Sequence, residues 1–143
     1  MPLKIQLKPK ERIIVNGAVI EGHATNRTEL VIMNNAAVMR QKHILQEGEA
    51  KTPATRLYFA VQLMYIDQDN KANYLEQFKR YHQDLVDTVS LPVLKRTLEL
   101  IGEAMASERL YEVLKLSREL IKVEAELLKI TPAIASHDDV DDE

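Results

Sequence analysis

Residues 11–45, ERIIVNGAVIEGHATNRTELVIMNNAAVMRQKHIL, decide the fold of this chain. β-Branched residues form short runs in this stretch, and turn-forming residues separate the runs. The pair Asn16-Gly17 stands between the runs 13–15 and 18–20. Both turn residues tolerate a positive φ, and such a pair is the strongest short-range signal for a β-hairpin. Because no helical period runs through the stretch, it predicts a small, strongly twisted antiparallel sheet.

Further strands are expected on both sides of that hairpin. Behind it, turns at 26–28 and 34–35 bound two extended runs, 30–32 and 36–40. Ahead of it, Leu3, Ile5 and Leu7 alternate with polar residues, which predicts an edge strand with one apolar face. Pro9 should end this first strand because proline cannot donate a hydrogen bond to a ladder.

Beyond residues 46–49 the pattern becomes helical. Thr52-Pro53 is a typical helix start, with a hydroxyl N-cap and a proline whose missing N–H costs nothing at the first helical position. Residues 67–70 should interrupt the helices, Ser90 should cap a third helix, and a fourth should run from near 107 to about Ile130. The prediction is an α+β chain, with the sheet followed by an antiparallel bundle of about four helices.

The fourth helix carries an apolar heptad seam, spaced 3-4-3-4-3 and widened by further leucines and isoleucines. This seam has two open interpretations, as internal packing between helices or as a surface for a partner or a second copy. For the second interpretation the candidate interface residues are Leu116, Leu120, Val123 and Leu127.

Length and composition bound the domain organisation. The 143 residues predict a β module at 1–48, a helical module at 49–132 and an acidic, disordered tail at 133–143. No apolar run approaches the roughly 20 residues of a membrane span, and the first residues lack the apolar region of a secretory signal. The chain has no cysteine. We therefore expect a cytoplasmic protein without membrane contact.

Charge is distributed unevenly. Residues 1–53 hold eight Lys/Arg against five Asp/Glu, whereas residues 54–143 hold eleven against seventeen. A basic sheet beside an acidic helical part suggests a polyanion partner for the sheet alone, although solvated surface charge explains the asymmetry about as well.

Candidate catalytic groups are few. The four histidines show no metal-ligand spacing, and the four glycines form no phosphate-binding loop. No serine, threonine or tyrosine stands in a nucleophile motif. We expect no enzyme activity, no metal site and no cofactor.

Two motifs of the sheet carry a family resemblance. Glu11-Arg-Ile-Ile-Val-Asn-Gly17 and Leu30-Val-Ile-x-Asn34-x-Ala36-x-Val38-x-Arg40 resemble the small translational repressor CsrA over residues 1–45. The chain departs from that family at Leu7, where an arginine is expected, and at Lys10, where a glycine is expected. CsrA-type sheets interleave strands from two chains, so the resemblance implies a homodimer. It also implies RNA contacts from Ile5, Gln6, Lys8, Val38 and Arg40.

Four cations of the sheet could support the same role. Lys4, Lys8, Arg40 and Lys42 can meet phosphates, and Arg40 and extended backbone can read the edges of unstacked bases. A solvated sheet face accounts for each lysine about as well.

Over residues 1–130 the chain resembles a second family, FlbT. The motifs that carry this resemblance are the start Met-Pro-Leu-Lys, residues 11–20, the block Thr52-Pro-Ala-x-Arg56-Leu-Tyr-x-Ala-Val-Gln-Leu-Met-Tyr65 and Leu110-Tyr111. The resemblance implies a cytoplasmic post-transcriptional regulator acting on the 5′ untranslated region of flagellin mRNA, with a protein called FlaF working opposite it. No DNA contact is expected. The alternative is a protein-interaction module that binds flagellin or a FlaF-type partner without reading RNA.

Overall fold

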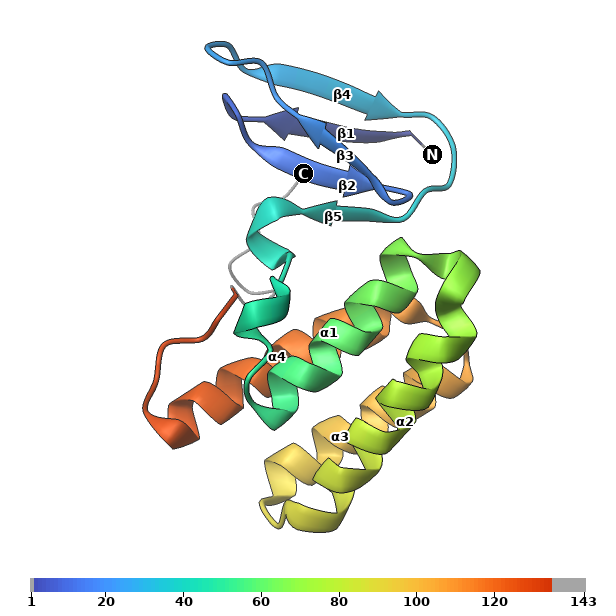
Figure 1. The fold of residues 1–143 in the computed structure, drawn as a ribbon, viewed down its shortest axis with the longest axis vertical. Helices are drawn as coiled ribbons and strands as arrows, with labels where there is room; N and C mark the ends of the chain where they lie inside the picture. Colours follow the sequence, from blue (N-terminus) through green and yellow to red (C-terminus); the bar gives the residue numbers. More distant parts are fainter. Residues whose placement is uncertain (1, 135–143) are drawn as a thin grey trace. The chain divides into compact units, whose positions relative to one another are not determined.

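A computed structural model describes residues 2–134 of the chain, and the account that follows concerns that part. Strands come first and α-helices follow, which confirms the predicted α+β class (Figure 1). The chain divides into two compact parts, a β unit that ends at Ile44 and a helical unit that begins at Leu45. Of the predicted acidic tail, residues 135–143 lie outside the described residues.

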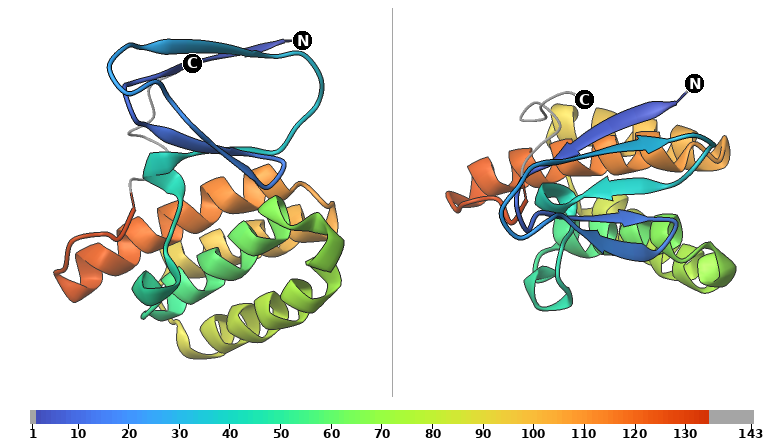
Figure 2. Two further views of the ribbon diagram at one scale, coloured as in Figure 1. Left: turned by 45° about the horizontal axis from the view of Figure 1, so that its top comes forward. Right: turned by 90° about the horizontal axis from the view of Figure 1, so that it is seen from above.

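The β unit contains two small antiparallel sheets that face one another across an apolar core (Figure 2). β1 pairs with β4, and β2 lies between β3 and β5. Ile5, Leu7 and Ile13 form the centre of the core, at 2% exposure or less. The strands are β1 (Leu3–Leu7), β2 (Arg12–Val15), β3 (Ala18–Glu21), β4 (Thr28–Ile32) and β5 (Val38–Arg40).

The predicted hairpin is confirmed. Val15 pairs with Ala18, and between them Asn16 has φ 50° and Gly17 has φ 85°, the two positive angles of a type I′ turn. The main chain of Asn16 donates to the Ala37 carbonyl at 2.8 Å, and its side chain accepts from the Ala37 N–H at 2.8 Å. This link fixes the chain before β5, so the last strand begins at Val38 rather than at the predicted residue 36.

One chain closes the core of the β unit. The pairs β1–β4 and β2–β5 both form within the same molecule. This fold therefore needs no strands from a second chain, which was the reason for expecting a homodimer. The homodimer stays a prediction.

In the helical unit, α1 (Pro53–Ile66) begins where the sequence predicts. Thr52 caps it and accepts from the Thr55 N–H at 3.2 Å. A carboxylate from the other end of the unit completes the cap: Glu124 accepts from the Thr52 hydroxyl at 2.6 Å and from the Ala54 N–H at 3.0 Å. A negative charge at a helix N-terminus is favourable because it meets free N–H groups and the positive end of the helix dipole.

The next two helices are α2 (Lys71–Thr88) and α3 (Pro92–Ala106), and a short 3₁₀ turn at Gln68–Asn70 separates α1 from α2 as expected. The prediction that Ser90 caps α3 is wrong. Leu91 occupies the cap position with extended φ −69° and ψ 127°, and it makes no side-chain cap bond. The reason is Pro92, which disfavours helical geometry in the residue before it and so sets the first helical position.

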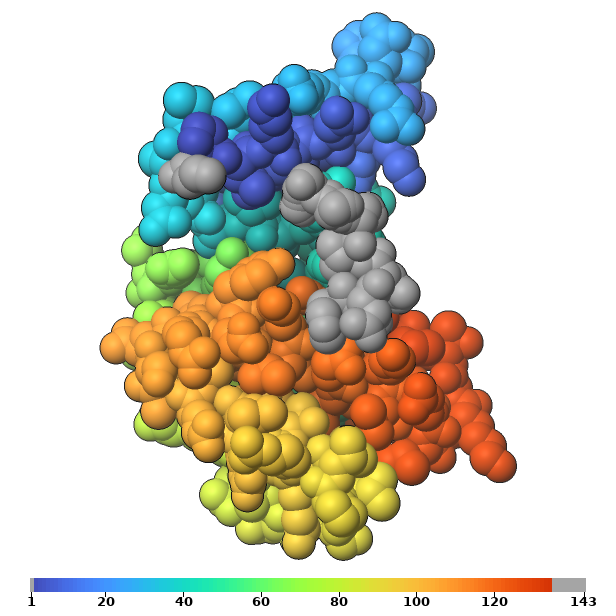
Figure 3. Space-filling view, turned by 180° about the vertical axis from the view of Figure 1, so that it is seen from behind, coloured from blue at the N-terminus to red at the C-terminus, as the bar shows by residue number. Residues whose placement is uncertain are grey.

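The last helix, α4 (Leu110–Leu128), ends two residues before the predicted Ile130, with Lys129 in the left-handed region at φ 59°. It packs on both α1 and α3, so its buried arc is wide and includes polar residues. In Figure 3 the last turns of α4 stand at the margin of the helical unit. None of the helices within residues 2–134 has the length and apolar composition needed to span a membrane.

Candidate functional site

The outer face of β1 carries the predicted polar side chains. Lys4, Gln6 and Lys8 are all exposed, because alternation along the strand turns them away from the core. Across the ladder, Gln6 lies opposite Glu29 and Lys4 lies opposite Val31. This face therefore combines two ammonium groups with an amide and an acid, and it is polar without being strongly basic.

Ile5 is not available as a side-chain contact. It is 2% exposed and lies in the centre of the core of the β unit. The RNA contact predicted at Ile5 stays a prediction, but this burial removes the Ile5 side chain from the surface. Leu7, where the CsrA resemblance expects an arginine, is 1% exposed in the same core.

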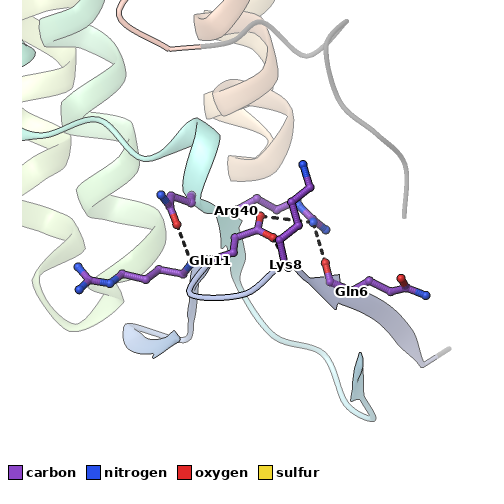
Figure 4. Close-up of polar contacts among 6 residues, drawn as sticks. Gln6, Lys8, Glu11 and Arg40 are labelled. Atoms are coloured by element: carbon purple, nitrogen blue, oxygen red, sulfur yellow. Dashed lines mark hydrogen bonds and ion pairs between the residues drawn. The ribbon is translucent and has the colours of Figure 1, made fainter. Parts of the chain in front are cut away.

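Arg40 stands at the end of β5 and joins the two sheets. Its Nη2 donates to the Gln6 carbonyl of β1 at 3.2 Å and lies 3.7 Å from the Glu11 carboxylate (Figure 4). Only 18% of the arginine side chain and 19% of the glutamate side chain are exposed. A base edge would have to compete with these two partners for the guanidinium.

Glu11 organises this corner, and sequence reasoning missed it. Besides meeting Arg40, it accepts from the Lys8 N–H at 2.9 Å, while its own N–H donates to the Lys8 carbonyl at 3.0 Å. In the same turn Lys10 has φ 65°, a left-handed conformation that favours glycine. The departure from the CsrA pattern at Lys10 was the available signal, because a glycine at that position of a family marks a tight turn.

The remaining predicted positions do not join this corner. Val38 packs half-buried against the core of the β unit, on the same face of β5 as Arg40. Lys42 belongs to the 3₁₀ turn Gln41–His43 and is half-buried. The structure thus brings together Lys4, Gln6, Lys8 and Arg40 along β1, whereas Val38 faces the core and Lys42 belongs to a separate turn.

The four residues predicted as an interface on α4 do not share one environment. Leu120 is 2% exposed and belongs to the core of the helical unit, Leu116 and Val123 are half-buried, and Leu127 is 54% exposed. Toward the C-terminal end of α4, Leu128 and Ile130 are also exposed, at 54% and 51%.

A buried polar pair holds the centre of the helical unit. The Arg118 guanidinium donates to the Tyr58 hydroxyl at 3.2 Å, and both residues are buried. Burial raises the pKa of the Tyr58 phenol to about 12, although the nearby charge of Arg118 opposes that rise. The phenol is therefore neutral at physiological pH and acts as a hydrogen-bond acceptor for the arginine.

α2 and α3 border an open groove of about 800 Å³, where the His82 Nε2 donates to the Leu98 carbonyl at 2.8 Å. Within residues 2–134 no three His, Cys, Asp or Glu side chains gather as metal ligands would.

Taken together, the fold and the surface define a two-part α+β protein with a polar outer face on its two-stranded sheet. The family model described as "Flagellar protein FlbT" matches residues 3–128. The chain belongs to the FlbT family.

Relatives in several bacteria share most of the chain. A protein of Caulobacter sp. (strain K31) named "Probable flagellum biosynthesis repressor protein FlbT" is 41% identical over 129 residues, covering 90% of this chain and 97% of the relative. The "Flagellum biosynthesis repressor protein FlbT" of Caulobacter vibrioides (strain ATCC 19089 / CIP 103742 / CB 15) is 37% identical over 128 residues, 90% of each chain. A relative from Rhodopseudomonas palustris (strain TIE-1) is 38% identical over 128 residues, covering 90% of this chain and 98% of its own. No solved structure matches the chain. The names place the family among regulatory proteins of flagellum biosynthesis.

Proposed function

We propose that this protein is a post-transcriptional regulator that binds the 5′ untranslated region of flagellin mRNA and controls its translation or stability. The names of the relatives support a repressor role in flagellum biosynthesis. The observation that carries the RNA proposal is the outer face of β1, where Lys4 and Gln6 are exposed, with Lys8 exposed just beyond the end of the strand. We place this activity in the cytoplasm, where the mRNA is translated.

The chemistry of that face suits single-stranded RNA. Ammonium groups of Lys4 and Lys8 meet phosphates and position the strand, whereas the Gln6 amide can both donate to and accept from a base edge. Glu29, opposite Gln6, repels phosphate and favours a path along β1. Arg40 holds the edge of this strand through its bond to the Gln6 carbonyl.

A salt series tests the proposal. The affinity for a fluorescent flagellin leader RNA is measured by anisotropy at several salt concentrations, with the Lys4→Ala, Lys8→Ala double variant beside the wild type. Each lost phosphate contact should flatten the slope of log K against log salt by about 0.7, so the double variant should lose about 1.4.

The matched control removes two exposed lysines from the helical unit, Lys79→Ala and Lys129→Ala. It should reduce net charge by the same amount and leave the slope within error. If the β1 double variant keeps wild-type affinity and slope while its circular dichroism stays native, the RNA proposal is wrong.

A second function is favoured by one observation, the exposed apolar side chains on α4. Leu127 and Leu128 at the C-terminal end of α4, and Ile130 just after it, are each more than half exposed. Large exposed apolar side chains that gather at one place on a surface mark binding sites for proteins. The candidate partners are flagellin itself and a FlaF-type protein.

Charge substitutions distinguish this role from internal packing. Leu127→Lys with Leu128→Lys should keep the fold, because both side chains are exposed and cations are favourable at a helix C-terminus. The same variant should lose a complex with purified flagellin or FlaF-type protein in calorimetry. Leu120→Lys is the contrasting variant, expected to unfold the helical unit because it buries a charge. An unchanged complex with the double variant would reject this second function.

A further inference from the structure

The two-stranded sheet of the β unit leaves one strand edge unpaired. β4 pairs with β1 on one side, and no strand of residues 2–134 pairs with its other side. An unpaired edge exposes a row of N–H and C=O groups, which is a template for another strand.

Two hydrogen bonds identify which backbone groups point outward. On β1 the Gln6 carbonyl accepts from Arg40, and just beyond its end the Lys8 N–H donates to Glu11, so even-numbered residues direct these groups away from β4. In an antiparallel ladder, a residue that directs its N–H and C=O groups away from the partner strand lies opposite a residue that also directs its groups away. Since Gln6 pairs with Glu29 and Lys4 pairs with Val31, the backbone groups of Glu29 and Val31 point to the open edge of β4.

The two edges of this sheet are protected unequally. On the β1 edge, side chains occupy the Gln6 carbonyl and the Lys8 N–H. The β4 edge, Thr28–Ile32 with Met33 after it, contains neither proline nor lysine, which block edge pairing in many proteins, and Glu29 is its single charged residue. Val31 and Met33 expose apolar side chains along it, at 45% and 73%.

We propose that two copies of this chain pair antiparallel through their β4 edges, with Val31 opposite Val31 of the second copy. In this register Leu30 lies opposite Ile32 of the second copy, so the half-buried residues of both cores become neighbours. Glu29 lies opposite Met33 of the second copy, and no like charges face one another. A register that pairs Glu29 with Glu29 of the second copy places two carboxylates opposite one another and is disfavoured.

The pairing is closed and self-complementary, as a two-fold interface requires. It produces a four-stranded sheet in the order β1-β4-β4-β1, with the Lys4 and Gln6 side chains of both copies on one face. This differs from strand exchange, because each chain keeps its own complete core. The inference does not depend on RNA binding.

Opposite charges at one position test the register. In the Val31→Glu variant the new carboxylate lies opposite Lys4 of its own chain, so this chain is expected to fold. Across the two-fold axis of the proposed dimer, however, two carboxylates then face one another. Val31→Lys places two ammonium groups there. Sedimentation equilibrium should show a wild-type dimer at micromolar concentration and a dimer weakened about tenfold or more in each variant alone.

Mixing the two variants should restore the dimer, because the Glu side chain then faces the Lys side chain. The control is Val19→Glu, a 65%-exposed valine on β3, which should leave the dimer unchanged. Hydrogen exchange on the wild type provides a readout that needs no variant, since amides 29 and 31 should become protected as concentration rises.

A monomeric wild type overturns the proposal, as does a dimer that survives both Val31 substitutions. Failure of the mixed variants to recover overturns the Val31-to-Val31 register. Should either variant unfold, exchange rates at 29 and 31 that do not depend on wild-type concentration overturn the edge pairing.

Discussion

Replacing Arg40 with alanine should lower the free energy of unfolding of the β unit by about 2 kcal/mol. The bond from its guanidinium to the Gln6 carbonyl is long, at 3.2 Å, so it contributes about 1.5 kcal/mol, the lower end for a charged donor. The ion pair with Glu11 at 3.7 Å adds less than about 1 kcal/mol. Burial of the arginine's alkyl stem, opposite Ile13 in the ladder, is counted as two methylenes at about 0.8 kcal/mol each. Rotamer entropy regained on truncation offsets about 1.5–2 kcal/mol of this total.

For a chain of this size, such a loss lowers the melting temperature by about 6–8 °C. Thermal and urea unfolding followed by circular dichroism measure it. Arg40→Lys should lie between alanine and wild type, because lysine keeps the charge near Glu11 but lacks the guanidinium whose Nη2 contacts both Gln6 and Glu11. Arg12→Ala is the matched control: its ion pair with Glu21 is 64% and 50% exposed and should contribute under about 0.5 kcal/mol.

The Arg40→Ala variant also distinguishes a structural role of Arg40 from direct contact with an RNA base. Well below its melting temperature, Arg40→Ala should keep leader-RNA affinity within about fivefold of wild type, less than 1 kcal/mol. An unchanged unfolding free energy, together with an affinity loss of 1–3 kcal/mol as expected for a lost base contact, would refute the reasoning and restore Arg40 as a reader of RNA.

Three further predictions concern stability. Glu124→Gln should cost about 2 kcal/mol in urea unfolding, because the neutral amide replaces the carboxylate that accepts from Thr52 and the Ala54 N–H. Lys10→Gly should raise the unfolding free energy by up to about 1 kcal/mol, since glycine removes the left-handed strain at φ 65° but adds chain entropy to the unfolded state. The pKa of Tyr58 is raised to about 12, whereas in the unfolded chain it is near 10. The stability that the neutral phenol contributes is therefore fully present below pH 10 and is progressively lost as pH rises from 10 to 12. Alkaline titration of tyrosine absorbance, run beside the unfolding transition, measures both.

Local chemistry was enough to predict much of the fold. Asn16-Gly17 determined a hairpin whatever lay around it, because positive φ at both positions suits only a tight turn that matches strand twist. Thr52-Pro53 likewise marked the start of α1, because capping and the fixed proline φ both act within one turn. Signals of this kind depend on a few neighbouring residues and can be read without knowing the tertiary structure.

Which residues of α4 face the core could not be predicted from neighbouring residues in the same way. The apolar stripe of this helix is wider than one heptad seam, so the seam and its neighbouring stripe fit the sequence equally well. The structure buries Ser117 and Arg118, because α4 packs on two helices and Tyr58 supplies the arginine with an acceptor. A buried charged residue is favourable only with such a partner, and that partner lies 60 residues away in the sequence.

The role of Arg40 shows the same dependence on distant partners at the site itself. The resemblance to CsrA transfers a position at the end of the last strand, where a guanidinium can reach RNA. Glu11 changes what that position does, because it meets the guanidinium and also holds the Lys8 N–H. With Leu7 buried in place of the expected arginine, the cation on β1 is Lys4, and Lys8 follows just beyond the end of the strand. Under the proposed function, RNA contact along this strand would come mainly from these two lysines and Gln6. Pairing of two β4 edges would double that surface without adding a charge to either chain.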